Sequence, residues 1–124
     1  MIKVFVYGTL LSEEPNNILL SSSKFLGEDS VEGFQMFNLG MFPACVPVSE
    51  NFTGYATIVG EVWEVDDETL KRLDYLEGYP NFYDRKEVET SFGKALIYFT
   101  PRQGDWLPDA PTIANGDWKK RYDA

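Results

Sequence analysis

The chain contains no histidine, and this absence limits the chemistry that its side chains can perform. It excludes catalysis by a serine–histidine or cysteine–histidine pair, and it excludes a metal site built on histidine. The single cysteine, Cys45, has no basic neighbour in sequence to lower its pKa, so we do not expect it to be a nucleophile. For acid–base chemistry near neutral pH, a carboxylate with a raised pKa is therefore the preferred base. A lysine, whose pKa must fall by several units, is a less economical alternative.

Two carboxylates, Asp74 and Glu77, lie one helical turn apart in the segment Leu73–Pro80. Glu77 is placed at the C-terminal end of an expected helix, where the negative end of the helix dipole disfavours an acid. A glutamate in that position is usually solvated, but its apolar neighbours are also compatible with a buried functional acid. Asp74 is the rival carboxylate, and we expect it to pair with Arg72 or Arg85 or to cap the turn.

The segment Tyr7-Gly8-Thr9-Leu10 directly follows the apolar run Ile2–Val6. Four of the five residues in this run are β-branched or aromatic, which predicts a short buried strand. Gly8 permits a turn after the strand, and Thr9 can cap the N–H groups that follow. Backbone N–H groups gathered at such a turn suit a carboxylate or a phosphate.

The remaining patterns predict several more strands and a few short helices. We expect strands over Val31–Leu39, with a bulge or close approach at Gly33, and over Tyr55–Val65, Phe82–Thr90 and Lys94–Thr100, the last two forming an antiparallel pair. We expect helices over Asn16–Leu20 and from Asp66 to Gly78, with helical spacing of Leu70, Leu73 and Leu76. Gly40–Ala44 is expected to be an apolar loop that lines something, and the tail beyond Pro101 to be rich in loops. These elements predict an α+β fold, a small and mostly antiparallel β-barrel with a few short helices packed outside.

Composition favours one globular domain over residues 1–124, because 44% of the residues are hydrophobic and 15% are aromatic. The formal charge of −9, from 20 acidic and 11 basic residues, repels phosphate backbones, so we expect no nucleic-acid partner. No apolar stretch approaches the roughly 20 residues of a membrane helix, and the N-terminus lacks the design of a signal peptide. We therefore expect a cytoplasmic protein with no membrane partner.

Six segments, in this order along nearly the whole chain, resemble the gamma-glutamylcyclotransferase-like family, which includes gamma-glutamylamine cyclotransferases and AIG2-like proteins. They are Tyr7–Leu10, Phe42–Ala44, Gly60–Val65, Leu73–Pro80, Tyr83–Arg85 and Gly116–Trp118. The resemblance implies a cavity that binds a small-molecule gamma-glutamyl substrate and an enzyme that releases 5-oxoproline and a free amine or amino acid. It places Glu77 on the position of the glutamate that acts as acid and base.

The same resemblance places the residues Tyr7, Gly8, Thr9 and Leu10 on the segment that holds the substrate. Pro43, Tyr83 and Tyr98 are further candidates for substrate binding. The two tyrosine hydroxyls could hydrogen-bond the substrate or Glu77, although aromatic packing is the default role of a tyrosine on a strand. Cyclisation by the substrate's own amine needs one carboxylate and no covalent nucleophile, so we expect no metal and no cofactor.

The segment that follows Leu10 carries two acids, Glu13 and Glu14, where many family members have a basic residue and a glycine. Asn16 or Asn17 is expected to take the role of the family's asparagine. Acids near the mouth of a cavity favour cationic leaving groups, such as the ε-amine of lysine or a polyamine. The alternative to an enzyme is a non-catalytic small-molecule-binding or interaction domain that keeps the same pocket.

Overall fold

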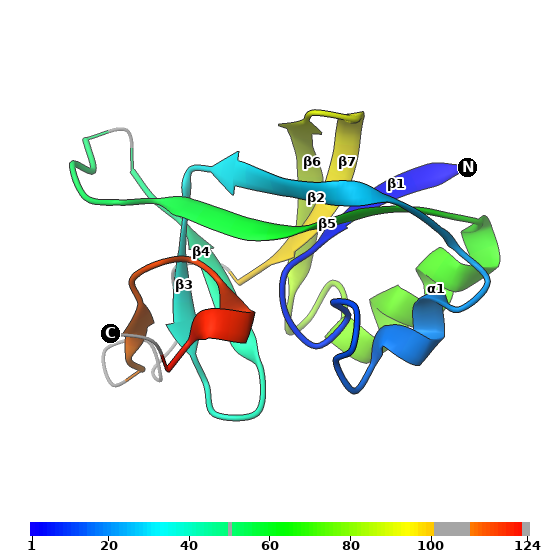
Figure 1. Cartoon of the computed structure of the whole chain (residues 1–124), viewed down its shortest axis with the longest axis horizontal. Helices are drawn as coiled ribbons and strands as arrows, with labels where there is room; N and C mark the ends of the chain where they lie inside the picture. Colours follow the sequence, from blue (N-terminus) through cyan, green and yellow to red (C-terminus); the bar gives the residue numbers. More distant parts are fainter. Residues whose placement is uncertain (50, 101–109, 123–124) are drawn as a thin grey trace.

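The computed structural model describes residues 1–49, 51–100 and 110–122, and its strands form two sheets (Figure 1). The larger sheet has the order β2-β5-β1-β7-β6, and the smaller one has the order β4-β3-β8. The larger sheet contains β1 (Ile2–Val6), β2 (Lys24–Glu32), β5 (Thr57–Val65), β6 (Asp84–Thr90) and β7 (Gly93–Phe99). The smaller sheet contains β3 (Phe34–Asn38), β4 (Pro43–Pro47) and β8 (Thr112–Ile113), and the helices are α1 (Asp67–Glu77) and the 3-10 turns η1 (Asn17–Leu20) and η3 (Trp118–Lys120).

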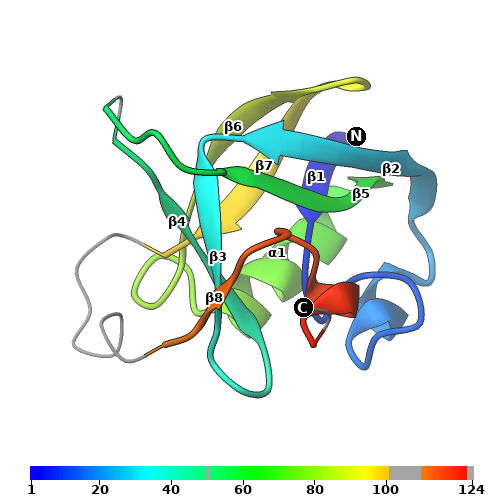
Figure 2. The same cartoon turned by 60° about the vertical axis from the view of Figure 1, so that its left-hand side comes forward.

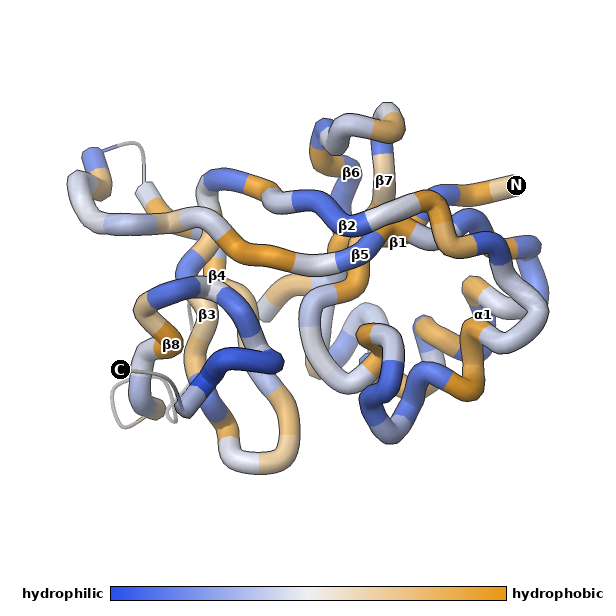
Figure 3. Tube along the Cα trace, viewed as in Figure 1, coloured by the Kyte–Doolittle hydropathy of each residue, from blue (hydrophilic) through white to orange (hydrophobic). Residues whose placement is uncertain are grey.

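The predicted strand over Ile2–Val6 is confirmed as β1, which lies at the centre of the larger sheet. It pairs antiparallel with β5 and parallel with β7, and the other pairings of this sheet are antiparallel. Its last three residues are buried and belong to the hydrophobic core. Figure 3 shows the hydropathy of each residue along the trace. The segment that follows β1 therefore begins in the interior of the molecule rather than at its surface.

The expected α+β class is confirmed, but the expected barrel is not found among the described strands. The two edge strands, β2 and β6, come together where the Asp29 carboxylate accepts the Ser91 N–H at 2.6 Å. No backbone ladder joins these edges in the described part of the chain, so the curled sheet does not close. The small sheet and α1 both lie on one side of the larger sheet (Figures 1 and 2).

The single strand expected over Val31–Leu39 is divided at Gly33, where the backbone adopts a φ of 98°. This conformation favours glycine, and it turns the chain from β2 in one sheet into β3 in the other. The expected loop over Gly40–Ala44 already contains the start of β4. This strand begins and ends with prolines, which suit an edge strand because they cannot donate to a central ladder.

Helix α1 forms where the capping signals predict it. The Asp66 carboxylate accepts the Thr69 N–H at 2.7 Å, and Gly78 ends the helix in the left-handed region with a φ of 65°. Leu70 and Leu73 are buried, whereas Leu76, which has the same helical spacing, is 39% exposed. Residues 101–109, where the expected loop-rich tail begins, lie outside the described residues. Among the described helices, none has the length and apolar character needed to cross a membrane.

Candidate functional site

A cavity of about 460 Å³ lies where the end of β1, the turn between β3 and β4 and the end of α1 come together. Its walls consist of Phe5, Val6, Tyr7, Gly8, Thr9, Leu10, Pro15, Asn16, Met41, Phe42, Pro43, Leu76, Glu77, Phe82, Tyr83 and Tyr98. Glu77 and all seven residues expected to bind the substrate are in this set, although they come from separate segments of the chain, whereas the rival carboxylate Asp74 is not. The volume is in the range of small-molecule sites, about 300–1,000 Å³.

The loop Tyr7–Leu10 leaves the sheet at the end of β1 and is held by two asparagine side chains. Asn16 Nδ2 donates to Thr9 Oγ1 at 2.9 Å, and Asn17 Nδ2 donates to the Leu10 carbonyl at 2.8 Å. The backbone N–H groups of Gly8, Thr9 and Leu10 donate to no acceptor in the described part of the chain. They are therefore available to a ligand anion, and Asn16 is also a wall residue of the cavity.

Gly8 is required by the close approach of a neighbouring chain segment. A Cβ atom at this position would lie 2.6 Å from Cγ and 2.7 Å from Cδ of Pro43. Positive φ, the usual reason for glycine in a turn, is not found at Gly8. The contact joins the loop after β1 to the first residue of β4, and so it closes one wall of the cavity.

Glu77 is the last residue of α1, and its half-buried carboxylate contributes to the cavity wall. Burial raises the pKa of this carboxyl to about 7, because removal of water disfavours the charged form. No hydrogen bond or cation from another described residue offsets this effect. A carboxyl with this pKa can both accept and return a proton near neutral pH.

The three tyrosines of the cavity direct their hydroxyl groups to protein acceptors rather than to Glu77. Tyr7 donates to the Tyr98 carbonyl at 2.6 Å, Tyr83 to the Pro43 carbonyl at 2.7 Å, and Tyr98 to Asp74 Oδ1 at 2.6 Å. Burial raises the pKa of each of these hydroxyls, so all three are neutral hydrogen-bond donors at physiological pH. The tyrosines therefore brace the walls, and their rings supply the surface that faces the cavity.

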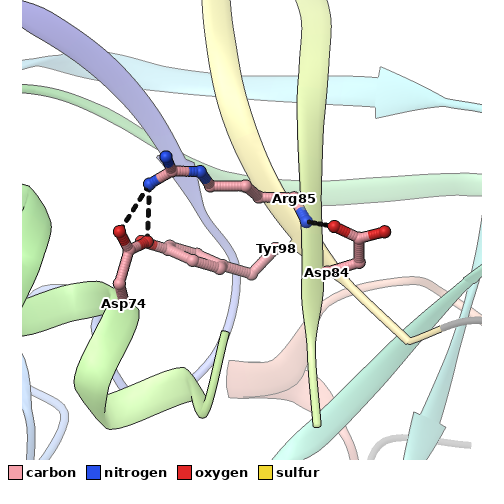
Figure 4. A network of polar contacts seen from close by, with 4 residues as sticks. All are labelled: Asp74, Asp84, Arg85 and Tyr98. Atoms are coloured by element: carbon pink, nitrogen blue, oxygen red, sulfur yellow. Dashed lines mark hydrogen bonds and ion pairs between the residues drawn. The ribbon is translucent and has the colours of Figure 1, made fainter. Parts of the chain in front are cut away.

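Asp74 pairs with Arg85, which was one of the two arginine partners expected from the sequence. Arg85 Nη1 lies 2.6 Å from Oδ1 and 2.7 Å from Oδ2 of Asp74 (Figure 4). The Arg85 guanidinium also lies over the Tyr79 ring, 4.3 Å from its centroid. With Tyr98 bound to the same carboxylate, Asp74 is fully engaged and is not the free acid of this region.

The expected apolar loop does line the cavity, through Met41 and Phe42 as well as Pro43. The hydrophobic composition of this loop was the feature of the sequence that predicted its place at a cavity. Leu76 and Phe82 also line the cavity but were not named as site residues. Their positions beside Glu77 and Tyr83 could have indicated them.

Glu61 is a buried carboxylate that the sequence analysis did not single out. It is 5% exposed and accepts hydrogen bonds from the Ser12 N–H at 2.9 Å and from Trp63 Nε1 at 3.1 Å. It thereby ties the segment after Leu10 to β5. Its place in the alternation of β5, on the same face as Val59, Trp63 and Val65, was the available signal.

The two acids expected near the mouth do not line the cavity. Glu13 is exposed, and Glu14 accepts the Trp118 Nε1–H at 3.0 Å, which fastens η3 to the loop. Buried Cys45 does not line the cavity either, and burial raises the pKa of its thiol well above the usual value. Within the described ranges, no cluster of three acidic or cysteine side chains could hold a metal ion.

Comparison with known proteins identifies similar chains over nearly the full length. The model of the family described as "Gamma-glutamyl cyclotransferase, AIG2-like" matches residues 4–120. The gamma-glutamylcyclotransferase family protein YtfP of Escherichia coli is 33% identical over 120 residues, which cover 97% of this chain and 98% of the relative. A crystal structure of an uncharacterized protein from Pyrococcus horikoshii has a TM-score of 0.79 at 32% identity and covers 97% of this chain and 92% of its own. The crystal structure of a mouse AIG2-like protein has the same fold, with a TM-score of 0.77 at 24% identity and coverage of 90% and 85%.

Proposed function

The chain belongs to the gamma-glutamyl cyclotransferase, AIG2-like family, and we propose that it converts a gamma-glutamyl amide into 5-oxoproline and a free amine or amino acid. In this proposal Glu77 is the general acid and base. Tyr7, Gly8, Thr9, Leu10, Pro43, Tyr83 and Tyr98 form the substrate-binding walls. The reaction is an intramolecular aminolysis that uses no metal and no covalent enzyme intermediate.

The environment of Glu77 carries the proposal. Its carboxyl has no polar partner among the described residues, and burial raises its pKa to about 7. The neighbouring carboxylate, Asp74, is bound by Arg85 and by the Tyr98 hydroxyl, so its oxygens already have protein partners. An unpaired carboxyl poised near neutral pH in a cavity is the arrangement expected of a general base.

The proton steps balance with this one carboxyl. The neutral α-amine of the substrate attacks its own γ-carbonyl carbon, which forms the C–N bond of the five-membered lactam. The Glu77 carboxylate takes the proton that the attacking nitrogen loses, and it then gives that proton to the departing amine as the original amide C–N bond breaks. Because the attack is intramolecular, a cavity that holds the glutamyl chain folded can lower the activation free energy by on the order of 7–11 kcal/mol.

In the same proposal, the loop Tyr7–Leu10 binds the α-carboxylate of the substrate. Its backbone N–H groups lack acceptors within the described residues, and the cavity wall contains no lysine or arginine there. Backbone N–H groups at a turn can hold an anion without a cationic side chain. Gly8 allows the close contact with Pro43 that shapes this turn.

The test is a direct assay of product. The purified protein is incubated with gamma-glutamyl amines, gamma-glutamyl amino acids and glutathione, and 5-oxoproline is measured by mass spectrometry. We expect release of 5-oxoproline from at least one class of substrate and none from the Glu77→Gln variant. Binding of the same compounds without any release would contradict the proposal and favour the non-catalytic binding domain.

A further inference from the structure

Several of the exposed apolar side chains lie at the candidate site. Met41 is 86% exposed, Phe82 46% and Leu76 39%, and all three line the mouth of the cavity. Phe82 is supported by Phe42, with an edge-to-face contact of 6.2 Å between ring centroids. Large apolar side chains clustered at the surface of a protein commonly mark a binding site.

A second hollow adjoins the cavity, and we call it the outer groove. It lies between η1 and α1 and is lined by Asn16, Ile18, Leu19, Glu68, Lys71, Arg72, Tyr75 and Leu76. Asn16 and Leu76 line both hollows, so the outer groove begins where the cavity ends. Two of its wall residues are also strongly exposed and apolar, Ile18 at 76% and Tyr75 at 90%.

The charges of these two hollows do not suit a cationic ligand. Glu77 is the only carboxylate of the described cavity wall, and the proposed reaction uses it at the reacting atoms. In the outer groove, Glu68 is paired with Arg72 at 3.0 Å, whereas Lys71 has no acidic partner among the described residues. A second ammonium group placed in the groove would meet Lys71 and no free acid.

We propose that the outer groove is the subsite for the amine half of the substrate, and that it takes an uncharged amine with an aromatic ring or an extended alkyl chain. The glutamyl half fills the cavity, and the amine half passes over Leu76 and lies between Ile18 and Tyr75. This inference rests on the proposed function. It replaces the expectation, drawn from Glu13 and Glu14, that the leaving group is cationic.

The experiment uses a series of gamma-glutamyl amides that differ only in the amine: ethyl, butyl, hexyl, benzyl and 6-aminohexyl. The hexyl and 6-aminohexyl compounds have the same chain and differ in one terminal ammonium group. For each compound, kcat/KM for 5-oxoproline release is measured with the wild-type protein. Affinity is measured by calorimetry with Glu77→Gln, which separates binding from turnover.

A fully buried methylene can raise affinity about fourfold. Because the groove is partly open, we expect hexyl to exceed ethyl by about tenfold or more in both measurements. We expect 6-aminohexyl to be about threefold weaker than hexyl, because its ammonium loses part of its water in the groove and is repelled by the exposed Lys71.

Two matched pairs of variants locate the effect. Tyr75→Ala should reduce the hexyl-to-ethyl ratio by at least about threefold, whereas Tyr55→Ala, an exposed tyrosine outside both hollows, should not change it. At low salt, Lys71→Glu should reduce the ratio of hexyl to 6-aminohexyl in kcat/KM and in affinity. Lys94→Glu, an exposed lysine on β7, should not change this ratio.

The outcomes separate the inference from the proposed function. Release of 5-oxoproline at equal rates along the series, or faster from 6-aminohexyl, overturns the apolar subsite and leaves the reaction standing. A hexyl preference in binding without any turnover supports the subsite and overturns the proposed reaction. Absence of both binding and turnover overturns both. A hexyl preference that Tyr75→Ala and Tyr55→Ala alter equally also overturns the outer groove as its origin.

Discussion

Arg85 binds both carboxylate oxygens of Asp74 through Nη1, at 2.6 and 2.7 Å. Asp74 lies one helical turn before Glu77, so this contact attaches the last turn of α1 to β6. Glu77 is then held at the cavity wall by the helix itself, without a polar partner of its own among the described residues. A paired acid thus fixes the position of an unpaired one.

Loss of Arg85 should destabilise the protein far more than loss of an exposed arginine. Arg85→Ala leaves the half-buried Asp74 carboxylate without its cation, and we expect the free energy of unfolding to fall by about 1–3 kcal/mol. The matched control is Arg72→Ala, whose pair with Glu68 is exposed and should contribute about 0.5 kcal/mol or less. Urea denaturation of the two variants measures both values, and equal losses would contradict the prediction.

Glu77→Gln should abolish release of 5-oxoproline while the fold and much of the ligand affinity remain. Glutamine has nearly the same shape but cannot accept and return a proton, so kcat should fall by at least about 10²-fold. Glu87→Gln, an exposed glutamate on β6, is the matched control and should keep the wild-type rate. A Glu77→Gln variant with a near wild-type rate would remove Glu77 from the reaction, and Asp74→Asn would be tested next.

The pH dependence of kcat/KM should show the ionisation of Glu77. Only the carboxylate can accept a proton from the attacking amine, and its pKa is raised to about 7 by burial. After kcat/KM is divided by the fraction of substrate whose α-amine is neutral, the rate should increase with pH and reach half of its upper value near pH 7. Measurement from pH 5 to 9 at constant ionic strength tests this, and a midpoint near the ordinary carboxyl value of 4.5 would contradict it.

The same carboxyl should make the protein less stable at alkaline pH than at acidic pH. The pKa of Glu77 is higher in the folded state than in the unfolded state, so folding takes up a proton between about pH 4.5 and 7. Above pH 7 the carboxyl is charged in both states, and the loss of stability caused by burying that charge has its full value. Glu77→Gln removes the cost, and we expect it to stabilise the protein by about 1–2 kcal/mol at pH 8, after allowance for solvent at this half-buried group.

At pH 4 the substitution should have little effect on stability, because the wild-type carboxyl is then protonated in the folded state and mostly protonated in the unfolded state. Thermal unfolding at the two pH values measures the difference. The exposed Glu87→Gln control should show no such dependence. An equal stabilisation by Glu77→Gln at pH 4 and pH 8 would mean that ionisation of Glu77 is not the cause.

A side chain at position 8 should conflict with Pro43. Gly8→Ala places a Cβ atom 2.6 Å from Pro43 Cγ, so we expect a loss of about 1–3 kcal/mol in stability and weaker binding of 5-oxoproline. Thr9→Ser keeps the hydroxyl that accepts the Asn16 amide and should be mild.

The double variant Gly8→Ala/Pro43→Ala should recover part of the lost stability, because it removes the two ring carbons that the new Cβ meets. A double-mutant cycle measures this coupling. Strictly additive losses would show that the contact between the two residues is not what requires glycine.

Elements defined by neighbouring residues could be predicted from the sequence. The strand β1 and the helix α1 follow from local apolar spacing, from the Asp66 cap and from Gly78. The second sheet could not be predicted, because β4 is short, has a proline at each end and depends on pairing with β3. The barrel was expected from a count of strands, but only the pairing of their edges decides whether a sheet closes.

For the proposed reaction, the sequence by itself favoured a carboxylate over a lysine as the acid–base group, because the chain has no histidine and Cys45 has no activating neighbour. It also brought forward Asp74 and Glu77 as the two candidates. Only the tertiary structure distinguished their surroundings, by bringing Arg85 and Tyr98 to Asp74 and leaving Glu77 at the cavity wall without a polar partner among the described residues. The reason is physical: residue types and local spacing set which groups can ionise. Desolvation and ion pairing, which set their pKa values, depend on contacts between segments far apart in the chain.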